Sequence, residues 1–351
     1  MKLAMFKIDT PVGPQSRFGV VKLDGGTDNT IEDARTNAGD VVDINFALAA
    51  KIAASGHGNP SARANAYCPP DLQAFITIHE CDLSLIEEAL EWVDENPGKK
   101  GVNGEIICWR LSQIALVPPI TSVPVLRDFA AFEDHLENTF SKMGLKIPPA
   151  WYEQPTAFKG NSTTMYGHDT SVPWPRYTKK LDYELELAAV IGRPAKDVPI
   201  DEAPNYILGY TLLNDFSARD TQRGEMNVST GPYKGKDFAW GLGPWIVTAD
   251  EFGDPATLKM AVRIDGEIWA ESTPGPMHWS FPEAVSYTSQ DELMNIGEVL
   301  GSGTVNNGCG FEIDRWIKPG ATVELEADRI GVLRHHVAPP NGKPITWRRA
   351  D

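Results

Sequence analysis

The sequence lacks the long apolar runs that membrane-spanning proteins contain. No stretch of its 351 residues approaches the roughly 18 apolar residues needed to cross a bilayer. The first residues, MKLAMFKIDTPVG, also lack the apolar segment of a secretory signal peptide. We therefore expect a protein that makes no membrane contact and works in the cytoplasm.

Cysteine is scarce, and basic residues are outnumbered. Cys68, Cys81, Cys108 and Cys309 show no CxxC spacing, so we expect neither a disulfide scaffold nor a zinc cage of cysteines. There are 32 Lys and Arg against 48 Asp and Glu, which gives a formal net charge of −16. Because nucleic acids bind basic surfaces, this balance argues against a nucleic-acid partner. The acidic excess alone does not indicate a metal site, since most acidic residues keep a surface soluble.

The chain is long enough for two domains, and its two parts differ in composition. The first part mixes short strands with helical stretches, two of which follow candidate N-caps, Asp43 and Asp71. A stiff, proline-rich joint occupies residues 118–124. Beyond it, many short strands alternate with Gly- and Pro-rich turns, and helices are few. We predict a mixed, largely β fold, with an α+β N-terminal domain at residues 1–117 and a β-rich domain at residues 118–351.

The segment DYELELAAVIG, residues 182–192, has the alternation of a strand. Side chains two positions apart share a face of a strand, so Glu184 and Glu186 lie side by side at one end of an apolar run. Their charges repel each other, and burial makes both more costly unless a cation or water lies against them. Periodicity alone favours a strand end that emerges into water over a metal site.

Two further carboxylates and a histidine lie outside this strand: Asp128 and His135 precede it, and Asp215 follows it. In RDFAAFEDHLENTF we predict a helix over residues 129–143, with Asp128 as its N-cap and His135 two turns later. On this interpretation His135 is an ordinary solvated residue on a helix face. Asp215 ends an apolar, strand-like run, and strand ends are positions where functional sites are often built.

Charged side chains also occur in three later segments. Arg219 and Gln222 lie one helical turn apart in DFSARDTQ, where a salt bridge to one of the two aspartates is the simplest interpretation of the arginine. Lys236 lies in GPYKGKDF, which lacks the order of a phosphate-binding loop and is simplest to read as a loop with a solvated lysine. Glu312 stands between two apolar residues, so we expect it to be partly buried and to need a partner such as histidine.

In combination and in this order, these segments resemble the fumarylacetoacetate hydrolase family. The resemblance covers about residues 120–340 and is weak for the first 117 residues. The segments that carry it are LDYELELAAVIG, ILGYTLLNDFSARDTQ, GPYKGKDF, LGPWIVTADE, GSGT at 301–304, and residues 319–337. It implies a β-rich fold, a roll or barrel of mixed sheet with few helices. It also implies a homodimer.

The resemblance further implies a role for each polar residue. The family's divalent cation, which all-oxygen ligation would make Mg²⁺, Mn²⁺ or Ca²⁺, is held by residues that match Asp128, Glu184, Glu186 and Asp215. The general base for water and the glutamate that orients it match His135 and Glu312. The residues that face the substrate and stabilise its enolate match Arg219, Gln222 and Lys236. A substrate-contacting threonine matches Thr304.

The chain departs from the family's pattern around the distal end of the pocket. Where the archetype presents tyrosine hydroxyls, the matching positions are Ala130, Phe158 and Met226. Trp240 stands in place of a threonine near the metal. We therefore expect a more apolar substrate than fumarylacetoacetate, such as an acylpyruvate or another 1,3-dicarbonyl acid.

Three functions follow as hypotheses. The first is a metal-dependent hydrolase that cleaves a carbon–carbon bond in an oxo acid, which the presence of His135 and Glu312 favours. The second is a family member of the lyase type, that is, an oxo-acid decarboxylase, dehydratase or isomerase with the same metal site. The third is a non-catalytic binding protein on the same scaffold, which the retention of every charged site position argues against.

Overall fold

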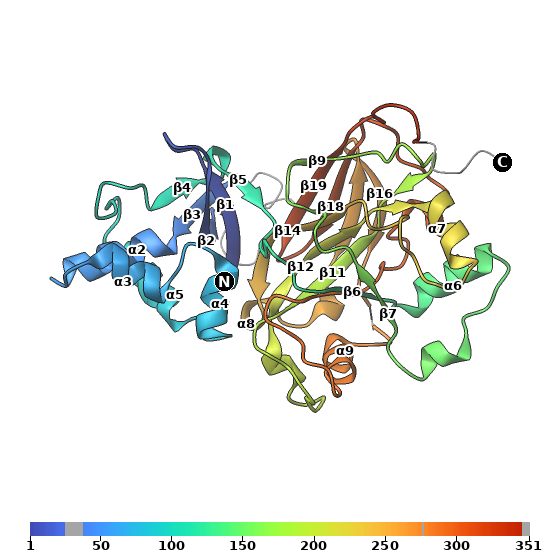
Figure 1. Cartoon of the computed structure of the whole chain (residues 1–351), viewed down its shortest axis with the longest axis horizontal. Helices are drawn as coiled ribbons and strands as arrows, with labels where there is room; N and C mark the ends of the chain where they lie inside the picture. Colours follow the sequence, from blue (N-terminus) through green and yellow to red (C-terminus); the bar gives the residue numbers. More distant parts are fainter. Residues whose placement is uncertain (25–37, 276, 346–351) are drawn as a thin grey trace.

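The computed structural model of the chain describes residues 1–24, 38–275 and 277–345. A smaller N-terminal part and a larger C-terminal part lie side by side along the longest axis (Figure 1). The N-terminal strands are β1 (Lys2–Ile8), β2 (Gln15–Leu23), β3 (Gly39–Asp43), β4 (Cys108–Arg110) and β5 (Ala115–Val117). The N-terminal helices are α2 (Ile44–Ala54), α3 (Pro60–Tyr67), α4 (Leu72–His79) and α5 (Ser84–Glu95).

The C-terminal part is rich in strands. They are β6 (Leu126–Phe129), β7 (Ala157–Gly160), β8 (Met165–Tyr166), β9 (Thr170–Val172), β10 (Leu181–Asp182), β11 (Leu185–Ile191), β12 (Ile207–Asp215), β13 (Ser217–Ala218), β14 (Trp240–Thr248), β15 (Met260–Ile264), β16 (Glu267–Ser272), β17 (Val299–Gly301), β18 (Thr322–Ala327) and β19 (Gly331–Val337). The helices are α6 (Glu133–Lys142), α7 (Arg219–Met226), α8 (Ala249–Phe252), α9 (Phe281–Thr288) and α10 (Gly310–Ile313). Short 3₁₀ turns occur at Leu111–Gln113, Pro149–Tyr152, Ala203–Tyr206 and Pro255–Thr257.

Two large sheets organise these strands. The larger runs in the order β4-β3-β2-β1-β14-β12-β11-β17-β6-β7, with β5 beside β1 and β8 beside β14. The smaller runs in the order β16-β15-β18-β19-β9. Most pairs are antiparallel, whereas β6 with β17, β8 with β14 and β9 with β19 are parallel. The predicted mixed, largely β fold is confirmed, and within the described residues both sheets keep two edges and do not close into a barrel.

The first strand connects the two parts of the molecule. Lys2 and Leu3 of β1 pair with Val247 and Ile246 of β14, so the sheet of the N-terminal part continues into that of the C-terminal part. The predicted N-caps form as expected: Asp43 accepts a hydrogen bond from the Phe46 amide, and Asp71 caps α4 in the same way. The domain boundary at 117/118 stays a prediction, since the β1–β14 pairing crosses it.

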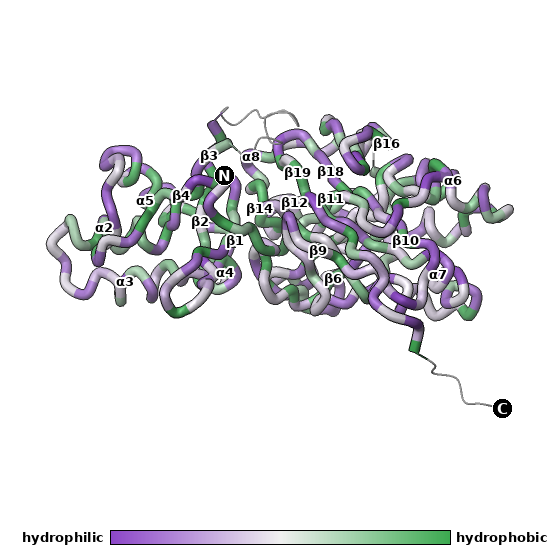
Figure 2. Tube along the Cα trace, turned by 90° about the horizontal axis from the view of Figure 1, so that it is seen from above, coloured by the Kyte–Doolittle hydropathy of each residue, from purple (hydrophilic) through white to green (hydrophobic). Residues whose placement is uncertain are grey.

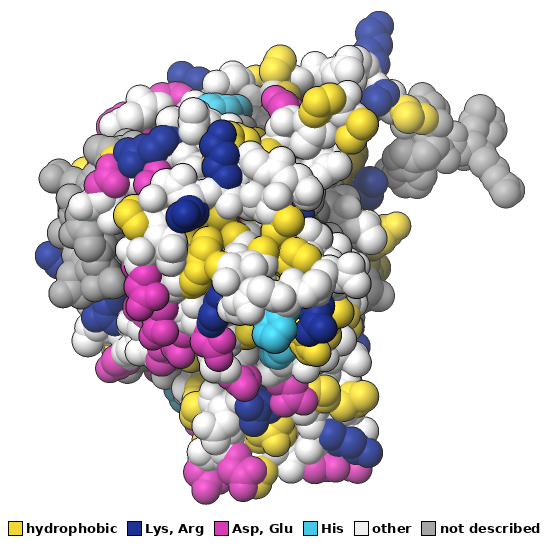
Figure 3. All heavy atoms as spheres, turned by 90° about the vertical axis from the view of Figure 1, so that its left-hand side faces the viewer, with side chains coloured by type: hydrophobic (Ala, Val, Ile, Leu, Met, Phe, Trp, Pro, Cys, Tyr) yellow, Lys and Arg dark blue, Asp and Glu magenta, His cyan; other side chains and the backbone are white. Residues whose placement is uncertain are grey.

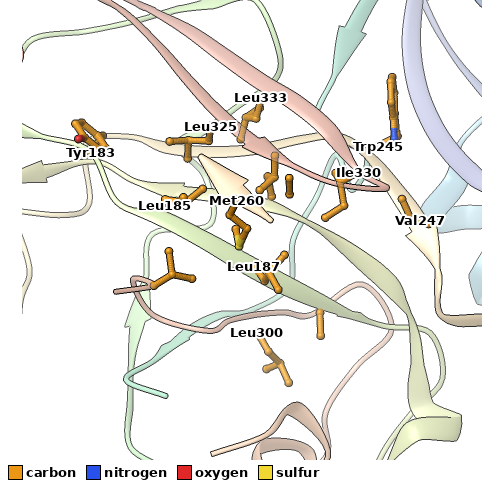
Figure 4. Close-up of a cluster of buried hydrophobic side chains, with 14 of the residues drawn as sticks. Tyr183, Leu185, Leu187, Trp245, Val247, Met260, Leu300, Leu325, Ile330 and Leu333 are labelled. Carbon is orange, nitrogen blue, oxygen red and sulfur yellow. The ribbon is translucent and has the colours of Figure 1, made fainter. Parts of the chain in front are cut away.

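Strand β11 has a different apolar layer on each face. Leu185 and Leu187 point into the layer between the two sheets, where they meet Met260, Leu325 and other side chains of the smaller sheet (Figure 4). Ala188 faces the other way, into the layer that extends to the N-terminal helices. The alternation read from the sequence is therefore correct, and it places Glu184 and Glu186 at one end of the strand.

The helix predicted over residues 129–143 is wrong in its first turn. Residues Leu126–Phe129 form β6, between β17 and β7, and α6 begins only at Glu133. Asp128 is therefore a strand residue and not an N-cap. Pairing on both sides of β6 supplies backbone hydrogen bonds that a helix would also have supplied, and this tertiary pairing decides between two similar local preferences.

Apolar stretches of the chain run through the strands, and hydrophilic stretches predominate in the peripheral loops (Figure 2). The face seen from the N-terminal side carries acidic and basic side chains interspersed with apolar ones (Figure 3). Among the residues that the structure describes, no helix is both long and apolar enough to span a bilayer.

Candidate metal and catalytic site

Four carboxylates meet at the end of the central strands. One oxygen of each lies within 4.8 Å of the others, and they belong to Asp128, Glu184, Glu186 and Asp215. The strand order explains the meeting, because β12, β11, β17 and β6 are consecutive neighbours in the sheet. The register places Glu186 opposite Leu213 of β12, two residues before Asp215, and Asp128 opposite Gly301 of β17.

These carboxylates are not solvated. Glu186 and Asp215 are 0% exposed and Glu184 is 5% exposed, so the interpretation of the strand end as emerging into water is wrong. Neither oxygen of Glu186 has a hydrogen-bond partner among the described residues, nor has Oδ1 of Asp215. Burial, with the nearby charges of Asp128 and Asp215, raises the pKa of Glu186 well above its ordinary value. Buried oxygens without partners indicate that a cation fits here.

Two cations, the buried Lys236 and the partly buried Arg219, lie against the carboxylates. Nζ of Lys236, which is 2% exposed, donates to Glu184 Oε2 at 2.6 Å and also to Asp215. The reading of Lys236 as a solvated loop lysine is therefore wrong. Burial opposes the ammonium charge, but Asp215 and Glu184 outweigh it and raise the pKa of Lys236. The same cation, followed by Arg219, lowers the pKa of Glu184 against the effect of burial.

Arg219 does not pair with an aspartate of its own segment. Its Nε donates to Asp182 Oδ2 at 2.8 Å, and its Nη2 lies 2.8 Å from Glu184 Oε1. Its Nη1 donates to Gln222 at 3.2 Å, which agrees with the predicted spacing of one turn. Sequence separation hid these partners, because Asp182 lies 37 residues before Arg219.

Asp182 is a functional candidate that sequence reasoning missed. It is 0% exposed and accepts hydrogen bonds from the amides of Gly310 and Phe311, at the start of α10, as well as from Arg219. A single carboxylate thus joins the arginine to the short helix that carries Glu312. The aspartate begins the recognisable segment DYELELAAVIG, but nothing local indicates contacts with residues 310 and 311.

His135 and Glu312 form a second group beside the first. His135 Nδ1 lies 2.9 Å from Glu312 Oε2, and their side chains are 15% and 0% exposed, so the solvated reading of His135 is wrong. Glu312 Oε1 accepts from the Asn307 amide at 3.1 Å and from Asn138 at 3.3 Å. The backbone of Cys309, three residues before Glu312, pairs with that of Glu184, which places the two groups next to each other.

Cys309 belongs to this second group as well. Its Sγ lies 3.4 Å from Glu312 Oε2, and its backbone pairs with that of Glu184 in an isolated bridge. Burial raises the pKa of the Cys309 thiol well above its ordinary value. Arg219 opposes this effect, and neighbouring carboxylates add to it. The thiol is therefore not prepared to act as a thiolate nucleophile at neutral pH.

The remaining predicted residues lie at different depths. Thr304 is 3% exposed in the loop after β17. Phe158 pairs with Asp128 across β6 and β7, and its ring centre lies 5.8 Å from Lys236 Nζ. Ala130 directly follows β6 and is partly buried. Met226 is 53% exposed at the end of α7, so it lies at the surface and not among the buried charges.

The donor set fits a divalent cation. Five buried carboxylates, including Asp182, stand against two cations, the buried Lys236 and the partly buried Arg219, so a doubly charged ion offsets most of the excess. Oxygen ligands suit Mg²⁺, Mn²⁺ or Ca²⁺ better than Zn²⁺. Gly301 leaves the space open: a Cβ there would lie 2.5 Å from Asp128 Oδ1 and 3.0 Å from Glu186 Oε2.

This close approach makes Gly301→Ala a test of the cation site. The methyl group would push Asp128 and Glu186 apart, and we expect the affinity for Mn²⁺ or Mg²⁺ to fall about tenfold or more, as for other changes that misplace metal ligands. Calorimetric titration measures this without any assay of activity. Gly58→Ala is the control, because a Cβ there meets nothing within 4 Å. Equal affinities in both folded variants would contradict the assigned site.

The affinity should also depend on pH. Burial raises the pKa of Asp128 to about 6, and that of Glu186 is raised too. A raised pKa keeps the carboxyl protonated over more of the acidic range, and the cation needs the ionised form. We therefore expect cation affinity to fall as pH drops through about 6, with proton release on binding. Calorimetry in buffers of different ionisation enthalpy counts the protons, and binding without proton release would contradict the expectation.

Comparisons with known proteins identify relatives of this chain. Residues 124–338 match the sequence model of the fumarylacetoacetate (FAA) hydrolase C-terminal domain. The oxaloacetate tautomerase YisK of Bacillus subtilis is 30% identical over 187 residues, which cover 53% of this chain and 62% of the tautomerase.

Two solved structures share the fold over nearly the whole chain. A 5-carboxymethyl-2-hydroxymuconate delta-isomerase from Mycobacterium smegmatis aligns with a TM-score of 0.62 at 23% identity, and covers 97% of this chain and 100% of its own. A fumarylacetoacetate hydrolase from Exiguobacterium antarcticum aligns with a TM-score of 0.63 at 20% identity, and covers 96% and 99%. Because the family model matches more than half of the sequence, the chain belongs to the fumarylacetoacetate hydrolase family.

Proposed function

We propose that the protein is a divalent-metal-dependent hydrolase that cleaves a carbon–carbon bond in an acylpyruvate-type oxo acid. The observation that carries this proposal is the contact of His135 Nδ1 with Glu312 Oε2, beside the four-carboxylate cluster. A histidine held by a carboxylate is suited to accept a proton. A cation next to it is suited to hold the oxo-acid end of a substrate.

The cluster and its cations would bind the oxo-acid end. The bound divalent cation would polarise the carbonyl oxygens and stabilise an enolate. Arg219 and Lys236 bring two further positive charges to the same place, and their carboxylate partners hold both side chains in fixed positions. Because these groups are almost fully buried, their charges act in a medium of low dielectric constant, where they stabilise a developing negative charge more than they would in water.

His135 would supply the nucleophile. With Nδ1 turned towards Glu312, Nε2 remains to accept a proton from water, and the resulting hydroxide attacks the carbonyl carbon distal to the oxo acid. The carbon–carbon bond then breaks, its electron pair remains on the leaving enolate, and a proton returns to that carbon. The products are a carboxylic acid and a 2-oxo acid. Asn138 and the Asn307 amide hold Glu312, so the imidazole partner does not rotate away.

Phe158 supports an apolar tail on the substrate. Its ring lies beside Lys236 and against the ring of Trp240, with the two ring centres 5.8 Å apart, and Ala130 adds a second side chain without a hydroxyl. Neither residue presents a hydroxyl to a second carboxylate of the substrate. This composition favours acylpyruvates with an alkyl or aryl tail over fumarylacetoacetate.

A second candidate function is tautomerisation, in which a proton shifts and no carbon–carbon bond breaks. It is supported by the 30% identity with the oxaloacetate tautomerase of Bacillus subtilis. Enolisation of a 2-oxo acid needs the same cation and the same proton acceptor, but no water attack. The two candidates therefore differ in what His135 deprotonates, water or the carbon next to the carbonyl.

A panel of substrates separates the candidates. The protein with Mn²⁺ or Mg²⁺ is given acylpyruvates of increasing tail length, fumarylacetoacetate and oxaloacetate, and the products are identified by mass spectrometry or NMR. Release of a carboxylic acid together with pyruvate indicates hydrolysis, whereas keto–enol conversion of oxaloacetate alone indicates the tautomerase. We expect apolar acylpyruvates to be cleaved fastest. Preferred turnover of fumarylacetoacetate would contradict the proposed preference for an apolar tail.

In the same assays, His135→Gln should lower kcat about a hundredfold or more, since a general base contributes at least this much. The affinity for the cation should remain, because His135 is not one of the four clustered carboxylates. His57→Gln is the matched control, since His57 is exposed in the N-terminal part. Full turnover by His135→Gln with the cation bound would rule out the proposed base.

Asp182 should act as a positioning residue. Asp182→Asn places an N–H group where only donors surround the side chain, so Arg219 and α10 lose their common acceptor. We expect kcat to fall about ten- to a hundredfold with a smaller change in KM. Asp43→Asn is the control, because Asp43 is also fully buried, pairs with an arginine, Arg17, and caps a helix. We expect a lower melting temperature in both variants, but a lower kcat only in Asp182→Asn.

A further inference from the structure

The group His135, Cys309 and Glu312 is itself a candidate for a metal. One ligand atom of each residue lies within 4.8 Å of the other two. Its chemistry differs from that of the carboxylate cluster, because it offers one nitrogen, one sulfur and one oxygen. Imidazole, thiolate and carboxylate together are a donor set typical of Zn²⁺, and thiolate favours soft cations over Mg²⁺.

The distances suit a tetrahedral ion. Usual zinc bond lengths place nitrogen and oxygen ligands about 3.4 Å apart, and sulfur and oxygen ligands about 3.6 Å apart. Here His135 Nδ1 lies 2.9 Å and Cys309 Sγ 3.4 Å from the same oxygen, Glu312 Oε2. An ion among the three needs outward shifts of a few tenths of an ångström, which rotation of the side chains supplies.

The three donor atoms contact one another, since Cys309 Sγ donates to Glu312 Oε2 at 3.4 Å and His135 Nδ1 lies 2.9 Å from the same oxygen. Cys309 forms no disulfide and is 0% exposed. Although His135 Nδ1 is close to Glu312, it has no hydrogen bond of regular geometry within the described part of the chain. The His135 side chain is 15% exposed, so the group lies close to solvent.

We propose that His135, Cys309 and Glu312 form an inhibitory site for a thiophilic divalent cation such as Zn²⁺ or Cd²⁺, next to the oxygen site for the catalytic cation. Binding breaks the S–H bond of Cys309, releases the proton to solvent and forms a sulfur–metal bond, with no change of oxidation state. An imidazole held by the ion no longer accepts a proton. The inhibition rests on the proposed function of His135, whereas the binding itself does not.

Binding is tested by titration of Cd²⁺ into the whole protein in excess Mg²⁺, which keeps the oxygen site supplied with its preferred ion. The ultraviolet charge-transfer band of the cadmium–thiolate bond reports the sulfur ligand. We expect the band in the wild-type protein and in Cys108→Ser, where an exposed free cysteine is removed, and its loss in Cys309→Ser. A band that persists at full strength in Cys309→Ser would overturn the site.

A variant of His135 distinguishes a metal site with several ligands from a single thiol that binds the ion alone. His135→Gln removes one of three ligands, and the Cd²⁺ affinity should fall about tenfold or more. Unchanged affinity would overturn the proposal even if Cys309 binds. Circular dichroism and melting temperature show that each variant is folded, and Cys309→Ala replaces Cys309→Ser if the buried hydroxyl prevents folding.

Inhibition is measured with Zn²⁺ in excess Mg²⁺, on whichever substrate the panel identifies. Each variant is compared with its own rate without Zn²⁺, so a change in basal activity does not matter. We expect inhibition of the wild-type protein that a chelator reverses, and at least about a tenfold higher half-inhibitory concentration in Cys309→Ser. A cadmium band without inhibition would overturn the inhibitory role. Absence of turnover on every substrate would instead count against the proposed function, and the cadmium titration would still decide the site.

Discussion

The mutual repulsion of buried carboxylates is the constraint on which the rest of the site depends. Glu184, Glu186, Asp128 and Asp215 converge because four neighbouring strands end or pass at the same place. Strand pairing and the apolar layers on both faces of β11 fix the backbone, so the charges cannot move apart. Cations must therefore come to them, and Lys236 is buried for this reason.

Two chemically different groups, the carboxylate cluster and the group of His135, Cys309 and Glu312, are held by one connected backbone. Glu184 pairs with Cys309 in an isolated bridge, and Asp182 holds both Arg219 and the start of α10. The oxygen cluster is suited to a hard cation and an enolate, and the neighbouring histidine group is suited to proton transfer. Under the proposed function, hydrolysis and enolisation would both use these two groups.

Much of the local structure could be predicted from residues near each other in the chain. The alternation of residues 185–191 indicated β11, and Asp43 and Asp71 were recognisable as N-caps from their positions before apolar runs. The candidate site could be predicted in outline because its residues lie in segments that resemble a family. Local signals failed for Asp128, which a helical pattern assigned to a cap and strand pairing placed in β6.

The sequence by itself determined the fold class, the family and the residue types available for a site, since composition, alternation and motif order are properties of the chain alone. Only the tertiary structure decided which charges face each other. It gave Arg219 its partners Asp182 and Glu184, buried Lys236, and brought Cys309 to His135. The reason is physical: burial and strand register set the dielectric environment and the distances between charges, and both depend on contacts between residues far apart in sequence.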